Sequence, residues 1–172
     1  YQTRDVPLTP QVASFYKNLK AQLLVEAAGE QVSAVNAAAA LNKLLQISGG
    51  AVYTDQGQTV EFDVRPRLHA LKEVLDETSN KVVVFVGFLH TIGVVTKYLD
   101  SEGISCEVIQ GSVSARERSQ IIERFQTQTD PRVLVVQPQS ASHGITLTAA
   151  DTIVFWSPVM SVEIYLQCIG RI

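Results

Sequence analysis

Small and hydroxyl-bearing residues gather in the segment Q-S-A-S-H-G-I-T-L-T at 139–148. The segment directly follows the apolar, β-branched run 132–137, which predicts a strand buried on both faces. Backbone amides in such a loop can bind phosphate oxygens, and the hydroxyls of Ser140, Ser142 and Thr148 can add contacts. An ordinary connection between two strands is the competing interpretation.

The end of the chain carries a second pattern, Gln-x-x-Gly-Arg, formed by Gln167, Gly170 and Arg171. An arginine at the edge of a domain can stabilise charge on a nucleotide held by a neighbouring domain. It can also simply bind the last carbonyl groups of a helix. The pattern is short, so it indicates a phosphate site only together with other motifs.

Basic residues recur in the segment 111–125, as Arg116, Arg118 and Arg124. One interpretation is a basic edge that faces a nucleic-acid backbone. Glu117 and Glu123 offset much of this charge, which favours a solvated helix face instead.

Other chemistries find no support in the sequence. The histidines His69, His90 and His143 lack metal-ligand spacing, so no metal site is expected. Cys106 and Cys168 show neither metal-ligand nor disulfide spacing, which favours a reducing compartment. No GxxxxGK[ST] sequence is present, so the chain has no P-loop of its own.

The elements that position these residues alternate from residue 81 onward. Apolar runs predict strands at 81–86, 105–109, 132–137 and 152–156. Ser114 and Ser161 have the right type and place to cap the N-termini of helices. Such alternation predicts an open parallel sheet with helices on both faces, and ligands bind such sheets at the carboxyl ends of their strands.

A helical and hairpin extension is expected to precede this sheet. Helices are predicted from Pro10 to Gly29, from Ser33 to Gly49, and from Pro66 onward, with a hairpin over 51–64. The predicted boundaries are therefore an extension at 1–78 and an α/β domain at 79–172.

Composition narrows the class of protein further. The chain has 172 residues, of which 46% are hydrophobic, and a formal net charge of −3. The apolar content excludes a disordered chain, and no apolar run or leader indicates membrane insertion or export, so a cytoplasmic protein is expected. The mild acidity argues against a histone-like binder but is compatible with a local phosphate-binding face.

Taken in order, these segments resemble the second, C-terminal RecA-like domain of superfamily-two helicases, and most closely the Swi/Snf-type DNA-dependent ATPases in their phage or prophage form. The similarity is carried by K-V-V-V-F-V-G-F at 81–88, the block at 108–125, the stretch 133–172 with "H-G-x-x-L-x-x-A", "W-S-P" and "Q-x-x-G-R", and K-L-L-Q-I-S-G-G-A-V-Y at 43–53. It covers essentially the whole chain.

The resemblance implies a motor domain of an ATP-driven translocase on DNA, with double-stranded DNA expected. Arg171 would be the catalytic arginine that reaches the γ-phosphate of ATP. Gly144, Gln167 and Gly170 would lie at the same nucleotide surface. The residues implied along the DNA backbone are Gly87, Phe88, Gly111, Ser112, Ser140, Ser142, His143 and Thr148.

ATP and Mg²⁺ would be bound mainly by an N-terminal RecA-like domain of the same parent chain, so the present chain alone is expected to be inactive. It begins at Tyr1 and ends one residue after Arg171, before the second arginine of the motif, as a segment of a longer protein would. Pro138 stands where many relatives carry a phosphate-binding Ser or Thr. The alternative function is a non-catalytic RecA-like interaction module or a nucleotide-binding module of another kind.

Overall fold

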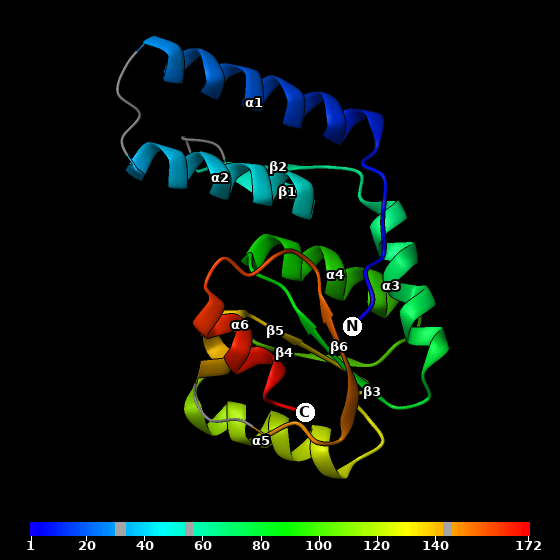
Figure 1. The fold of residues 1–172 in the computed structure, drawn as a ribbon. Coiled ribbons are helices and arrows are strands. Elements are labelled where there is room, and N and C mark those ends of the chain that lie inside the picture. The colour runs from blue at the N-terminus through cyan, green and yellow to red at the C-terminus, as the bar shows by residue number, and fades with distance from the viewer. Residues whose placement is uncertain (30–33, 54–56, 143–145) are drawn as a thin grey trace. The chain divides into compact units, whose positions relative to one another are not determined.

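The computed structural model describes residues 1–29, 34–53, 57–142 and 146–172. The chain forms two compact units, residues 1–70 and 71–172 (Figure 1). The units divide within the helix α3 (Arg65–Glu77), whereas the predicted boundary lies after residue 78.

The first unit contains two helices and a short hairpin. α1 (Pro10–Gly29) and α2 (Ala34–Gly49) are followed by the antiparallel strands β1 (Ala51–Tyr53) and β2 (Thr59–Glu61), which agrees with the predicted helices and hairpin. Their core is formed by Val12, Ile47, Val52 and Phe62. Gly50 follows α2 with a φ of 116°, a conformation that L side chains rarely adopt.

The second unit is a parallel sheet of four strands in the order β4-β5-β3-β6. The strands are β3 (Lys81–Phe85), β4 (Cys106–Ile109), β5 (Val133–Val136) and β6 (Ala150–Phe155). The helices of this unit are the end of α3, then α4 (Leu89–Ser101), α5 (Ala115–Thr127) and α6 (Val162–Ile169). Between β5 and β6 the chain forms the 3₁₀-helix η1 (Pro138–Ser142), where the sequence predicts a loop.

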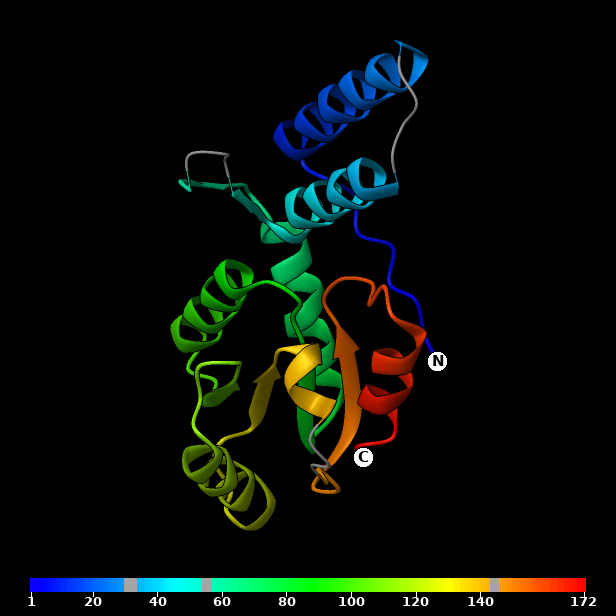
Figure 2. The same cartoon turned by 90° about the vertical axis from the view of Figure 1, so that its left-hand side faces the viewer.

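Helices cover both faces of the sheet, as the sequence predicts. Val83 and Phe85 of β3 pack with Phe125 of α5 and Cys168 of α6 in one core. Val82 and Val84 point to the opposite face because side chains alternate along a strand, and both are fully buried. Figures 1 and 2 show α4 on that opposite face, as a right-handed crossover from β3 to β4 requires.

Serine caps set the start of two helices. The Oγ of Ser114 accepts a hydrogen bond from the Glu117 N–H over 3.2 Å at the start of α5. The Oγ of Ser161 accepts one from the Ile164 N–H over 3.3 Å at the start of α6. Both predicted caps are therefore confirmed. α6 ends at Ile169 with Gly170 as its C-cap, so the helix stops before the chain does.

Candidate functional site

The four parallel strands end level with one another. Phe85 of β3 pairs with Val136 of β5 and Phe155 of β6, and Val136 also pairs with Ile109 of β4. The loops that follow these strands, residues 86–88, 110–112, 137–140 and 156–158, therefore lie along one side of the sheet, which we call the carboxyl edge.

Gln137 ties two of these loops together. Its side-chain Oε1 accepts a hydrogen bond from the backbone N–H of Gly111 over 3.2 Å. Its carbonyl oxygen accepts one from the Ser140 N–H over 2.8 Å, and its own N–H donates to the Ile109 carbonyl oxygen over 2.8 Å. One glutamine thus holds the turn after β4 and the start of η1 in a single arrangement.

The polar groups of the carboxyl edge differ in exposure. Gly111 and Ser112 are exposed, and the Ser112 Oγ accepts a hydrogen bond from Nε2 of Gln110 over 3.1 Å. Ser140 is only 4% exposed, so its hydroxyl lies in the interior. The turn at 111–112 is therefore open to solvent, whereas the Ser140 hydroxyl is not.

Gly87 and Phe88 lie where β3 passes into α4. A Cβ atom on Gly87 would lie 3.8 Å from the Oγ of Ser157, so the loops after β3 and β6 are neighbours. Phe88 is the extended N-cap of α4, and its carbonyl oxygen accepts from the Ile92 N–H over 3.0 Å. Within this first turn Thr91 is fully buried, and its Oγ1 has no hydrogen-bond partner among the described residues.

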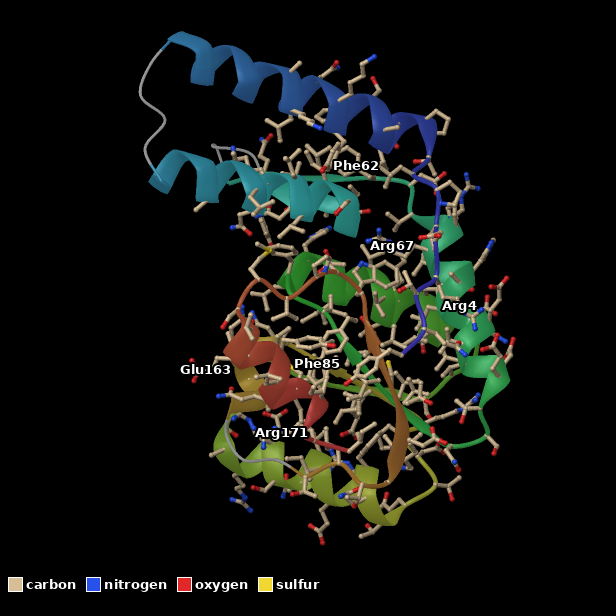
Figure 3. All side chains as sticks on the ribbon, viewed as in Figure 1. Arg4, Phe62, Arg67, Phe85, Glu163 and Arg171 are labelled. Atoms are coloured by element: carbon tan, nitrogen blue, oxygen red, sulfur yellow. The ribbon has the colours of Figure 1, made fainter. Side chains whose placement is uncertain are left out.

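Arg171 lies at the other side of the sheet. The backbone N–H of Leu147, three residues before β6 begins, donates to the Arg171 carbonyl oxygen over 2.6 Å. α6 therefore runs antiparallel to β6, from the carboxyl edge to the amino end of that strand. Figure 3 shows this direction through Glu163, in the first turn of α6, and Arg171, after its last turn.

Gln167 and Cys168 lie in the last turn of α6, just before Arg171. The Nε2 of Gln167 donates to Oε1 of Glu163 over 3.3 Å, and its own Oε1 is buried without a hydrogen-bond partner among the described residues. Cys168 is fully buried, and burial raises the pKa of its thiol to about 11 although Arg171 opposes the shift. Cys168 is therefore a packing residue, protonated at neutral pH.

The segment 139–148 does not form one loop at the carboxyl edge. Its first part belongs to η1, whereas Thr148 lies at the amino end of β6, where its Oγ1 accepts a hydrogen bond from Gln126 over 3.3 Å. The physical reason is topological: β5 and β6 are parallel, so the connection must return the chain to the opposite edge before β6 can begin.

The structure therefore divides the predicted site residues into two groups. At the carboxyl edge it places Gly87, Phe88, Gly111, Ser112 and Ser140. At the opposite side it places Thr148, Gly170 and Arg171, with Gln167 in the last turn of α6. Ser142 ends η1, and His143 and Gly144 lie outside the described residues.

The arginines of α5 have different environments. Arg124 forms a bidentate ion pair with Glu107, with its Nε at 2.8 Å from Oε1 and its Nη2 at 2.9 Å from Oε2. This hydrogen-bonded carboxylate raises the pKa of Arg124. Arg116 is exposed, and Arg118 is half-buried with no partner for its Nε among the described residues. Arg124 is thus engaged within the domain, while Arg116 faces solvent.

Sequence reasoning missed Gln126 and Gln137, two glutamines of the second unit whose side chains join separate segments. Gln126 binds the segment before β6, and Gln137 binds the turn after β4. No local signal identifies them, because each side chain reaches a residue at least 20 positions away.

The described residues contain no group of three or more His, Cys, Asp or Glu side chains that could hold a metal ion. They also contain no helix that is long and apolar enough to cross a membrane.

Comparisons with known proteins agree with this fold. A human protein, "DNA annealing helicase and endonuclease ZRANB3", is 34% identical over 92 residues, which are 51% of this chain and 8% of that protein. The chain spans between 7% and 12% of the length of the first three curated relatives that it matches.

Two solved structures from Sulfolobus solfataricus share the architecture. The "SWI2/SNF2 ATPase C-terminal domain" superposes with a TM-score of 0.73 at 22% identity, over 88% of this chain and 68% of that one. The "SWI2/SNF2 ATPase core in complex with dsDNA" superposes with a TM-score of 0.71 at 25% identity, over 88% of this chain and 33% of that one. The sheet and its helices are thus RecA-like.

A family model, the helicase conserved C-terminal domain, matches residues 66–172. This match includes all four strands of the parallel sheet and both groups of predicted site residues. The chain therefore belongs to the helicase conserved C-terminal domain family.

Proposed function

We propose that this chain is the C-terminal motor domain of a DNA-dependent ATPase that translocates on double-stranded DNA. The observation that carries the proposal is the separation of two surfaces on one domain. Backbone and hydroxyl groups of the turn at 111–112 are exposed at the carboxyl edge, and Arg171 lies at the opposite side of the same sheet. A motor needs both a track surface and a nucleotide surface.

The carboxyl edge is the proposed DNA-backbone surface. Exposed hydroxyl groups such as that of Ser112 bind phosphate oxygens without reading bases, and Gly111 beside it has no side chain to block the approach of a DNA backbone. Gly87 and Phe88 continue this surface at the start of α4, whose first N–H groups can also face an anion. We also propose Ser142 and His143 as DNA-backbone residues, whereas the buried Ser140 would support this surface from the interior. The comparison structure with double-stranded DNA supports the substrate class.

Arg171 is the proposed catalytic residue. A guanidinium that meets the γ-phosphate when two domains close stabilises the charge that develops during phosphoryl transfer. Gln167, Gly170 and Gly144 would complete this surface. Arg171 would supply the positive charge that this domain brings to the nucleotide. As the family resemblance implies, we assign ATP and Mg²⁺ mainly to an N-terminal RecA-like domain of the same parent.

Closure of the two domains would bring Arg171 to the phosphate, and opening would withdraw it. Alternation of these states would step the two domains along DNA. We propose that Thr148 belongs to the Arg171 surface and not to the DNA surface. Its neighbour Leu147 donates its backbone N–H to the Arg171 carbonyl oxygen. A cytoplasmic parent of phage or prophage type completes the proposal, and the genes that neighbour the parent gene test that origin.

The test compares this chain with its full-length parent. The parent is expected to hydrolyse ATP faster when double-stranded DNA is added, whereas the isolated chain is expected to hydrolyse none. DNA-stimulated hydrolysis by the isolated chain would contradict the proposal. Tight ATP binding by the isolated chain would favour a nucleotide-binding module, and a parent that neither binds DNA nor hydrolyses ATP would favour an interaction module.

A further inference from the structure

Gln126, in the last turn of α5, bridges to the segment that precedes β6. Its Nε2 donates to the Thr146 carbonyl oxygen over 3.0 Å and to the Thr148 Oγ1 over 3.3 Å. Its Oε1 accepts from the Ala149 N–H over 2.8 Å. A single side chain therefore uses both ends of its amide to fix a stretch of four residues.

That stretch is also the backbone anchor of Arg171. Leu147 lies between the residues that Gln126 holds, and its N–H donates to the Arg171 carbonyl oxygen over 2.6 Å. The Leu147 side chain is fully buried in the same core as Cys168, so the anchor is fixed on two sides. On the helix side, the Arg171 N–H donates to the Cys168 carbonyl oxygen over 3.3 Å.

We propose that Gln126 is a positioning residue for Arg171, acting through the Leu147 hydrogen bond. This inference rests on the proposed role of Arg171 at the nucleotide. The chain of contacts runs from the Gln126 amide to the 146–149 backbone, then to the Arg171 carbonyl group. These contacts fix the backbone position of Arg171 after the end of α6. The position of its guanidinium group depends on that of its backbone.

A purely structural role is the competing explanation, because loss of three hydrogen bonds also lowers stability. The two explanations differ in what else changes. A positioning residue affects turnover without affecting DNA affinity, since the carboxyl edge lies at the other end of the strands. A purely stabilising residue lowers the unfolding midpoint and leaves the turnover of the folded enzyme unchanged.

The experiment uses the full-length protein with Gln126→Ala and Gln126→Glu, and Gln120→Ala as control. Gln120 is an exposed glutamine on the same helix. Glu keeps the acceptor for the Ala149 N–H but replaces the amide donor. Three quantities are measured: amide hydrogen exchange at Leu147 and Ala149, the kcat and KM of DNA-stimulated ATP hydrolysis, and affinity for a DNA duplex.

Gln126→Ala is expected to speed exchange at Leu147 and Ala149 and to lower kcat about tenfold, as small misplacements of catalytic groups do. The KM for ATP and the DNA affinity should stay within about twofold. Gln126→Glu should lower kcat less than Ala does. In a double variant with Arg171→Ala, the Gln126 substitution should lower kcat no further, because both residues act on the same step of ATP hydrolysis.

The results separate the inference from the proposed function. If Arg171→Ala leaves kcat unchanged, the proposed role of the arginine fails whatever Gln126 does. If Arg171→Ala abolishes turnover but Gln126→Ala leaves exchange and kcat unchanged, only the inference is overturned. If Gln126→Ala prevents folding, Thr148→Val, which removes a single hydroxyl from the bridge, decides by the same exchange and kcat measurements.

Discussion

The backbone N–H of Gly111 and the side-chain Oε1 of Gln137 form a 3.2 Å hydrogen bond that joins the turn after β4 to the end of β5. Gly111 and Ser112 are exposed, whereas Gln137 is half-buried behind them. The turn that offers polar groups to a phosphate is thus fixed from inside by a residue two elements later in the chain.

Replacing Gln137 by Met is expected to weaken DNA binding by the full-length protein. The methionine keeps the size of the side chain but removes the acceptor, so the turn at 111–112 is no longer held. Loss of one neutral hydrogen bond is worth about 1 kcal/mol, or roughly fivefold in affinity. The measurement is fluorescence anisotropy with a labelled duplex at several salt concentrations.

The salt series sharpens this test. Gln137 carries no charge, so the slope of log affinity against log salt should stay the same while the affinity falls. Gln128→Ala, an exposed position at the far end of α5, is the control. Unchanged affinity in Gln137→Met would show that the turn at 111–112 does not contribute to DNA binding.

Arg171→Lys is expected to lower ATP turnover without lowering DNA affinity. Lysine keeps the positive charge but loses the planar, two-pronged donor geometry that suits a phosphate. Arginines that stabilise phosphoryl transfer contribute about a thousandfold or more to kcat, so we expect a loss of at least tenfold for the conservative change. Steady-state ATPase assays with saturating duplex measure it, and anisotropy measures DNA affinity.

Arg171→Lys is thus expected to lower turnover and keep DNA affinity, whereas Gln137→Met is expected to lower DNA affinity and keep turnover. The two variants differ because Arg171 lies beside the amino end of β6 and not at the carboxyl edge. A common loss of both activities in either variant would contradict two separate surfaces.

The sequence predicted the frame of the domain well because its signals are local. The β-branched runs from Lys81 and from Arg132 form the central strands β3 and β5, and Ser114 and Ser161 cap the predicted helices. Each of these features depends on a few consecutive residues and on burial.

The arrangement of the candidate site could be predicted only in part. Gly87 and Gly111 follow strands directly, so their place at one edge followed from parallel pairing. The separation of Thr148 from them depends on the path of the β5–β6 connection, which composition does not reveal. The side-chain bridges of Gln126 and Gln137 join residues distant in sequence, so only the folded chain brings them together.

Arg116→Ala and Arg124→Ala are expected to affect DNA binding differently. Arg116 is exposed, so a basic edge on α5 would lose one phosphate contact with it, and the salt slope would fall by about one. Arg124 is paired with Glu107, so its loss should leave the slope unchanged and lower the urea midpoint only slightly, because partly exposed ion pairs contribute little to stability.

Salt-dependent anisotropy and urea unfolding distinguish these variants. If neither arginine changes the slope, α5 is a solvated helix face. If Arg124→Ala changes the slope as much as Arg116→Ala does, the ion pair with Glu107 must open when DNA binds.

Cys168 is expected to resist thiol reagents in the native protein. It is fully buried, and burial raises the pKa of its thiol to about 11, so at pH 8 only about one part in a thousand is the reactive thiolate. Modification then requires local opening of the core around α6.

Burial also raises the pKa of Cys106, but that residue is half-buried and should react first. Mass spectrometry after timed alkylation, with Cys106→Ser as the single-thiol reference, measures both rates. Equal rates for Cys168 in native and urea-unfolded protein would mean that α6 does not pack on the sheet as the structure shows.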